Sequence, residues 1–191
     1  MKSLSASKNP GDLRASKWIV LTVISFGTLI STLDGGMVSV SYPALAEAFK
    51  TDISTILWVT VAYWITAVGL LLTMGWIGDQ FGKRRVFIIG SIVFTLGILM
   101  AGVSYNVWYL IGARIFQGVG SSMVLSTLNA LITANFPDKQ RGMALGVSGA
   151  VVGVGLSAGP LLGGLLLDIL DWRALFYTRV PLGILGILLA W

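Results

Sequence analysis

Long apolar runs, separated by short polar connections, make up most of this chain. A helix needs about 20 apolar residues to cross about 30 Å of hydrocarbon, so each run is long enough to be a membrane-spanning helix or close to it. The connections, such as DQFGKRR and PDKQRG, are too short to be domains. The pattern predicts an all-α, polytopic membrane helix bundle with six spans, at about residues 18–40, 56–78, 86–103, 107–127, 143–167 and 175–191.

The two ends of the chain differ from the runs between them. Residues 1–17 are polar and basic, contain Pro10 and Gly11, and are predicted to form a mobile cytoplasmic tail rather than a signal peptide. The last run has 17 residues from Leu175 to Trp191, which corresponds to about 25 Å of helix. Because no charge follows it, the sixth helix is expected to be truncated, and the chain to be a half-length product.

Composition restricts the function. Charged residues make up 11% of the chain, less than half of the roughly 25% that is usual, which indicates a membrane protein. The chain has no cysteine and no histidine, which excludes disulfides, thiol or imidazole catalysis and the usual zinc sites. We therefore expect neither an enzyme nor a bound metal or cofactor. The basic residues lie mainly in the connections, so the net charge of +5 does not indicate nucleic-acid binding.

The distribution of basic residues predicts the orientation. Connections on one side of the predicted membrane hold only Lys50 and Arg173. The tail and the other connections hold nine: Lys2, Lys8, Arg14, Lys17, Lys83, Arg84, Arg85, Lys139 and Arg141. Positive residues accumulate on the cytoplasmic side of membrane proteins. The chain is thus predicted to be a multi-pass protein of the plasma (cytoplasmic) membrane with its N-terminus in the cytoplasm.

Two opposite charges fall inside predicted spans at matching depth. Asp34 lies roughly 9 Å below the outer boundary, and Arg114 roughly 10 Å below it, by helical rise. They can neutralise each other, and a carboxyl group alone in hydrocarbon binds a proton more readily than one paired with a guanidinium. Asp34 is therefore a candidate proton carrier, although a static ion pair that fixes packing remains an alternative. Gln117, on the same face as Arg114, is a candidate for binding substrate or Arg114.

Three local motifs stand on or between the spans. GWIGDQFGKRR, from Gly75 to Arg85, is a short loop whose Gly82 permits a tight reversal. RIFQGVGSS, from Arg114 to Ser122, gives the fourth span small residues for close helix approach. In the fifth span, Gly155, Gly159 and Gly163 are spaced by four residues and are predicted to form a groove for a neighbouring backbone, and Pro160 is predicted to bend the helix. The same motif includes Gly146 and Gly164.

These motifs resemble, in order and on the matching spans, those of the major facilitator superfamily, and the match covers nearly the whole chain as the N-terminal six-helix half. LDGGMVSVSYPAL, from Leu33 to Leu45, and DWRALFYTRVPLG, from Asp171 to Gly183, are similar to segments of the fourteen-span drug/proton antiporters. The resemblance implies a coupling or substrate site at Asp34, Arg114 and Gln117, and an antiporter hinge in the fifth span. It also implies a conformational latch in the loop, at Gly75, Asp79, Gly82, Lys83, Arg84 and Arg85.

Some positions depart from the family pattern. Gln80 stands where the family usually has a basic residue, which is expected to weaken the latch. Arg179 stands where these antiporters commonly have asparagine, and adds a charge near the outer end of the sixth span. Gly35 and Gly36 replace bulkier residues and are expected to loosen the first helix.

The resemblance implies a transporter that uses the proton gradient to export hydrophobic or cationic small molecules by alternating access. Its expected partners are the lipid bilayer, the substrate, protons, and a C-terminal half or a second half-chain. Two alternatives remain: proton-coupled solute uptake, and a non-transporting fragment or half-transporter that needs a partner half.

Overall fold

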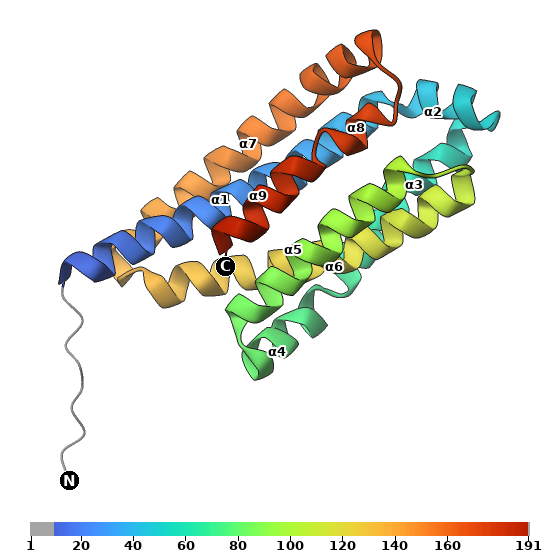
Figure 1. Ribbon diagram of the computed structural model, residues 1–191. Coiled ribbons are helices and arrows are strands. Elements are labelled where there is room, and N and C mark those ends of the chain that lie inside the picture. Colours follow the sequence, from blue (N-terminus) through green and yellow to red (C-terminus); the bar gives the residue numbers. More distant parts are fainter. Residues whose placement is uncertain (1–9, 191) are drawn as a thin grey trace.

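Between Pro10 and Ala190, the residues that the computed structural model describes, the chain forms a bundle of helices (Figure 1). Side chains are described for residues 17–128 and 130–189. The helices are α1 (Pro10–Val40), α2 (Tyr42–Phe49), α3 (Ile53–Gly69), α4 (Leu71–Phe81), α5 (Lys83–Gly102), α6 (Val107–Asn135), α7 (Asp138–Ile169), α8 (Ala174–Tyr177) and α9 (Val180–Ala190).

The first helix is longer than the sequence predicts. Helix α1 begins at Pro10, so residues 10–17, predicted to belong to the tail, extend it. Proline suits the first position of a helix because its fixed φ is helical and its missing N–H would have no partner there. The rest of the predicted tail, residues 1–9, and Trp191, the predicted end of the last span, lie outside the described residues.

Four of the described helical segments are long and apolar enough to cross a membrane: Lys17–Val40, Lys83–Gly102, Val107–Asn135 and Asp138–Ile169. The pair α2 and α3 also meets this criterion when taken together, with a bend of 118° between the two helices. Residues Ala174–Leu189 form a shorter apolar helical segment. The division into six spans therefore remains a prediction, while the helical bundle itself agrees with the expected fold class.

Two predicted spans are each divided into two helices. The second contains α3 and α4, which meet at Leu70 directly after Gly69, a residue with low helix propensity. The sixth contains α8 and α9, which are separated by Thr178 and Arg179. Pro181 explains the second break, because its nitrogen has no hydrogen to donate to the carbonyl of Tyr177 and its ring would collide with that carbonyl. The first connection also contains a helix, α2.

Helices α1 and α7 run parallel and in a fixed register. Lys17 donates a hydrogen bond to Gln140 at 2.7 Å, and the two are 123 residues apart. The close approach of Gly36 to Gly159 has the same separation of 123 residues. A Cβ added to Gly159 would lie 2.8 Å from Cα of Gly36, so only glycine permits this crossing. Gly36 therefore allows α1 to pack tightly, where the sequence predicted that it loosens the helix.

Helix α6 packs against both α3 and α5, again through glycines. A Cβ on Gly118 would lie 2.8 Å from the carbonyl oxygen of Tyr63 in α3. A Cβ on Gly120 would lie 2.3 Å from the nitrogen of Phe94 in α5. The small residues of RIFQGVGSS thus bring two neighbouring backbones close to the turn that carries Arg114. In Figure 1, α3, α5 and α6 lie on one side of the bundle, and α1, α7 and α9 on the other.

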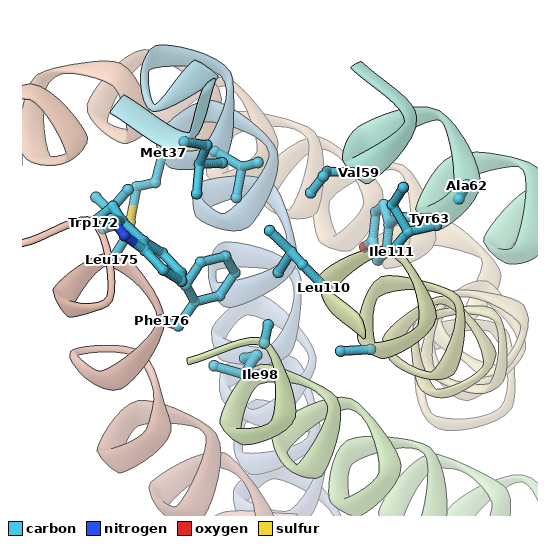
Figure 2. Close-up of a cluster of buried hydrophobic side chains, with 14 of the residues drawn as sticks. Met37, Val59, Ala62, Tyr63, Ile98, Leu110, Ile111, Trp172, Leu175 and Phe176 are labelled. Carbon is cyan, nitrogen blue, oxygen red and sulfur yellow. The ribbon is translucent and has the colours of Figure 1, made fainter. Parts of the chain in front are cut away.

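An apolar core joins the two sides of the bundle. Figure 2 shows Val59 and Tyr63 of α3 on one side of this core and Leu175 and Phe176 of α8 on the other, with Leu110 of α6 between them. All five side chains are at most 1% exposed. Because these side chains exclude water, any charge placed among them must find its partners within the protein.

Helix α3 begins at a charged cap outside the apolar segments. The carboxylate of Asp52 accepts hydrogen bonds from the hydroxyl of Thr55 at 2.7 Å and from its backbone N–H at 3.0 Å. These bonds favour the ionised form and hold the pKa of Asp52 below its ordinary value. The cap therefore stabilises α3 above the pKa of an unfolded aspartate, about 3.9, and this contribution is lost as the pH falls through the lower folded value.

Acidification or the substitution Asp52→Ala should therefore reduce the protection of the first turn of α3 against amide hydrogen exchange, relative to the intrinsic exchange rate at the same pH, as measured by NMR or mass spectrometry. Asn106 is a matched control, because its amide oxygen caps α6 by accepting from the N–H of Tyr109 at 2.7 Å and does not titrate. Equal acid sensitivity of the two helix starts would contradict the role assigned to the Asp52 carboxylate.

Candidate functional site

Asp34 lies in α1, and its side chain is completely buried. It is the only buried carboxylate among the residues whose side chains are described. Two residues later comes Gly36, where α1 meets Gly159 of α7. The tight glycine crossing thus fixes the height and direction of the turn that carries Asp34.

Arg114 of α6 forms an ion pair with Asp34. Its Nη1 lies 2.7 Å from Oδ2 of Asp34 and donates to Oδ1 at 3.0 Å. The Nε of Arg114 donates to the carbonyl oxygen of Val59 at 3.2 Å, and its guanidinium stands 4.5 Å from the ring centre of Tyr63, a favourable cation–π arrangement. The structure therefore brings together the two charges that the sequence placed at the same depth.

Gln117 connects the two charged side chains. Its side-chain oxygen accepts from Nη1 of Arg114 at 2.6 Å, and its side-chain nitrogen donates to Oδ1 of Asp34 at 3.1 Å. The sequence proposed that Gln117 binds either substrate or Arg114. In this structure its side chain is buried and bonded to both members of the ion pair.

Arg179 is a third charged member of the site. It lies at the break between α8 and α9, is 1% exposed, and its Nη1 contacts Oδ1 of Asp34 as an ion pair. Its Nε donates to the carbonyl oxygen of Leu175 at 2.6 Å, and its guanidinium lies 5.2 Å from the ring centre of Phe176. The break caused by Pro181 sets Arg179 at the height of Asp34.

The sequence singled out Arg179 as a departure from the family pattern but did not connect it to Asp34. One signal pointed there: a charge that replaces a neutral residue inside an apolar run needs a buried counter-charge. The depth of Arg179 could not be calculated from helical rise, because the interruption between α8 and α9 changes the register.

The site has more positive than negative charge. One carboxylate, Asp34, faces two guanidiniums, those of Arg114 and Arg179, and all three groups are buried. The Nη2 atoms of both arginines are buried and have no hydrogen-bond partner. The one carboxylate of Asp34 thus links α1 both to Arg114 of α6 and to Arg179 at the α8–α9 break.

The latch residues lie apart from this site. Gly82, with φ +96°, forms the turn between α4 and α5, a conformation that favours glycine. Asp79 pairs with Lys83 across this turn at 3.3 Å. The other residues of the predicted latch are Gly75, in α4, and Arg84 and Arg85, in the first turn of α5. The described contacts of Asp34 do not involve any of these residues.

The fifth-span motif divides into two groups. Gly155, Gly159 and Gly163 face α1, and an added Cβ on any of them would lie within 3 Å of an α1 atom. Gly146 and Gly164 have open space where a Cβ would be. Helix α7 continues through Pro160 without interruption. The predicted groove therefore exists, and the helix that fills it is α1, which carries Asp34.

Comparison with known proteins gives a consistent picture. The family model described as Major Facilitator Superfamily matches residues 24–191. The chain is 38% identical over 173 residues to the riboflavin transporter RibZ of Clostridioides difficile, and covers 38% of that protein. It is 30% identical to the tetracenomycin C resistance and export protein of Streptomyces glaucescens, and 37% identical to a puromycin resistance protein of Streptomyces alboniger. These alignments include 90–91% of this chain.

Solved structures show the same fold at low sequence identity. A peptide transporter crystallised with sulfate superposes with a TM-score of 0.80 at 15% identity, over 90% of this chain and 37% of the transporter. A bacterial homologue of the lysosomal transporter Spinster, inward-facing and unoccupied, superposes with a TM-score of 0.75 at 17% identity, over 91% of this chain and 41% of that one. The chain therefore spans between about a third and two-fifths of the length of these proteins.

Proposed function

Because the chain belongs to the Major Facilitator Superfamily, we propose that it is part of a transporter that exports hydrophobic small molecules in exchange for protons, with Asp34 as the proton-binding group. Members of this family are multi-pass membrane transporters rather than enzymes, and they act on small-molecule substrates within a lipid bilayer. The substrate class, the direction and the coupling are the parts of the proposal that need support.

The observation that carries the proposal is the burial of Asp34 between two arginines of different helical segments. Without a proton, its carboxylate holds Arg114 of α6 and Arg179 of the α8–α9 break against α1. A proton on Asp34 removes the negative charge and both ion pairs, so the packing of these segments changes with proton occupancy. A two-state element of this kind is what couples a proton to alternating access.

Export is supported by the relatives. One is named for tetracenomycin C resistance and export, and others for puromycin resistance and multidrug resistance. The sequence suggested hydrophobic or cationic substrates. Two guanidiniums and one carboxylate carry a net positive charge, which repels a cation. We therefore assign as substrates hydrophobic compounds that place no positive charge near Asp34.

The remaining machinery follows from the resemblance. We propose that the N-terminus and the Asp79–Lys83 turn are cytoplasmic, that this turn acts as the latch with Arg84 and Arg85, and that the Gly155–Gly163 face of α7 is the hinge. We further propose that transport needs a second six-helix unit, since alternating access moves one half of this fold against the other.

Two alternatives have specific support. A relative with 38% identity is named a riboflavin transporter, a name that states neither resistance nor export, so proton-coupled uptake stays a second candidate. The chain covers only 38% of that relative, which keeps a non-transporting fragment or a half-transporter as a third.

A vesicle assay tests the proposal. Inverted membrane vesicles that contain the chain are loaded with protons, and proton release is recorded with a pH-sensitive dye after addition of riboflavin, an uncharged compound, or ethidium, a hydrophobic cation. We expect each transported compound to drive proton release in the wild type, and we expect Asp34→Asn to abolish this release. Asp168→Asn should retain it, because Asp168 is an exposed carboxylate on α7.

Three results would contradict parts of the proposal. Undiminished release by Asp34→Asn would remove Asp34 from the mechanism. Proton movement in the same direction as the compound would favour uptake over export. No release by the inserted wild-type chain, with or without a co-expressed second half, would favour the non-transporting fragment.

A further inference from the structure

The buried charges around Asp34 do not balance, and two donor groups there lack acceptors. Asp34 supplies one negative charge, while Arg114 and Arg179 supply two positive charges. In each arginine, Nε donates to a backbone carbonyl and Nη1 contacts Asp34, but Nη2 is buried without a hydrogen-bond partner. Leaving buried charged donors unpaired is costly.

Protonation of Asp34 increases this imbalance. The protonated carboxyl group is neutral, so two guanidiniums would remain buried with no counter-charge. No other described carboxylate is buried, so no acid of the described chain is in place to replace Asp34. Arginine side chains are not deprotonated in proteins, so both guanidiniums keep their charge. Charge balance in the protonated state therefore requires a negative ion from outside the described chain.

Among the described residues, few charged or titratable groups lie around Asp34. Helix α3 contributes Tyr63, whose hydroxyl is hydrogen-bonded to Ser121 at 2.9 Å, and α6 contributes Arg114 with Gln117. The described charged residues of the neighbouring helices α5 and α7 lie near the ends of those helices: Lys83, Arg84, Arg85, Asp138, Lys139, Arg141 and Asp168. Asp34 is thus the group whose titration changes the charge of the cluster.

We propose that the Arg114–Asp34–Arg179 cluster is a binding site for a monovalent anion, which enters as Asp34 takes up a proton. The anion accepts hydrogen bonds from the guanidinium N–H groups that the carboxylate releases, together with those of the two Nη2 atoms. Planar guanidinium groups suit both a halide and a carboxylate, so the anion is either an inorganic ion or an acidic group of a transported compound.

The inference rests on the proposed role of Asp34 as the proton-binding group. Because the anion and the proton each make binding of the other more favourable, they occupy the site together and move in the same direction. In an export cycle, an inorganic anion therefore accompanies the proton inward. An acidic group on the transported compound would instead travel with the proton, which corresponds to proton-coupled uptake, the second candidate function, and not to export in exchange for protons.

Equilibrium binding tests the proposal on the 191-residue chain in nanodiscs of phosphatidylcholine. Chloride and benzoate are titrated separately at about pH 8 and about pH 5, and binding is measured by calorimetry and, for chloride, by ³⁵Cl NMR line broadening. We expect binding of at least one anion to be tighter at the lower pH by about tenfold or more, the usual size of such coupling. Tighter chloride binding identifies an inorganic ion, and tighter benzoate binding identifies an acidic compound.

Variants assign the binding to the cluster. Asp34→Asn imitates the neutral carboxyl group, so it should bind the anion at both pH values as tightly as the wild type does at about pH 5. Arg179→Asn should lose the binding. Arg173→Asn is the matched control, because Arg173 pairs with Asp171 at the exposed outer end. This variant should bind the anion as the wild type does.

Absence of binding by the wild type at about pH 5, equal binding at both pH values, or unchanged binding in Arg179→Asn would each overturn the proposal. The first two of these outcomes are measured on the wild type, so they test the proposal even if a variant fails to fold. The vesicle assay separates this inference from the proposed function: proton release that depends on Asp34, without any anion binding, would overturn the anion site alone. Anion binding that depends on pH, with proton release unaffected by Asp34→Asn, would instead contradict the transport role of Asp34.

Discussion

Asp34→Asn is expected to destabilise the bundle more than a substitution of either arginine alone. The neutral amide leaves Arg114 and Arg179 buried without a counter-charge, whereas loss of one arginine leaves Asp34 still paired with the other. Removing one partner of a buried ion pair typically costs about 3–5 kcal/mol. The free energy of unfolding in detergent, followed by loss of helical circular dichroism, measures the difference.

A second substitution distinguishes this explanation from a local packing defect. Arg179→Asn, added to Asp34→Asn, removes one of the two uncompensated charges and should restore about 1–3 kcal/mol of the lost stability, a coupling expected for residues in direct contact. Proton coupling should not return. Additive losses in the double variant would contradict the charge-balance explanation, and Asp168→Asn serves as the control for substitution of an exposed carboxylate.

Gly159→Val is expected to separate α1 from α7. A Cβ at this position would lie 2.8 Å from Cα and 3.1 Å from the carbonyl carbon of Gly36, and 3.1 Å from the carbonyl oxygen of Leu33. These are backbone atoms, which cannot rotate away, so overpacking of this kind costs about 1–3 kcal/mol or more. Because Asp34 lies between Leu33 and Gly36 in α1, the displacement should also weaken its contact with Arg114 and reduce compound-driven proton release.

Gly153→Val is the matched control on the same helix. A Cβ there meets no atom within 4 Å, and valine has a higher helix propensity than glycine, so its free energy of unfolding should not fall. Equal destabilisation by the two variants would show that valine lowers the free energy of unfolding through its effect on helix α7 alone. The α1–α7 crossing would then not explain the loss of stability.

The hydrophobic pattern was sufficient for the fold class and for the approximate positions of the long helical segments, but not for helix α2 or for the breaks inside the second and sixth predicted spans. A chain that crosses hydrocarbon must satisfy its backbone hydrogen bonds within each helix, so apolar length alone locates the helices approximately. The cost of a buried charge identified Asp34 and Arg114, and helical rise set them at one depth. Family membership followed from motifs that lie in the same order on the same segments.

Pattern alone did not identify the third charged group of the site. Arg179 was visible as an unusual residue, but its contact with Asp34 depends on the break between α8 and α9, which changes the register after Tyr177. Helical rise could not give its depth across an interruption whose geometry depends on the packing of both helices.

The sequence by itself determined that this is a helical membrane protein, because hydrophobic length is a property of single segments, and its motifs indicated the family, because they are read along the chain. Only the tertiary structure decided that α1 and α7 are in register at Gly36 and Gly159, and that two arginines share one carboxylate. These contacts join residues far apart in the chain, and their geometry depends on how the backbones of several helices approach one another.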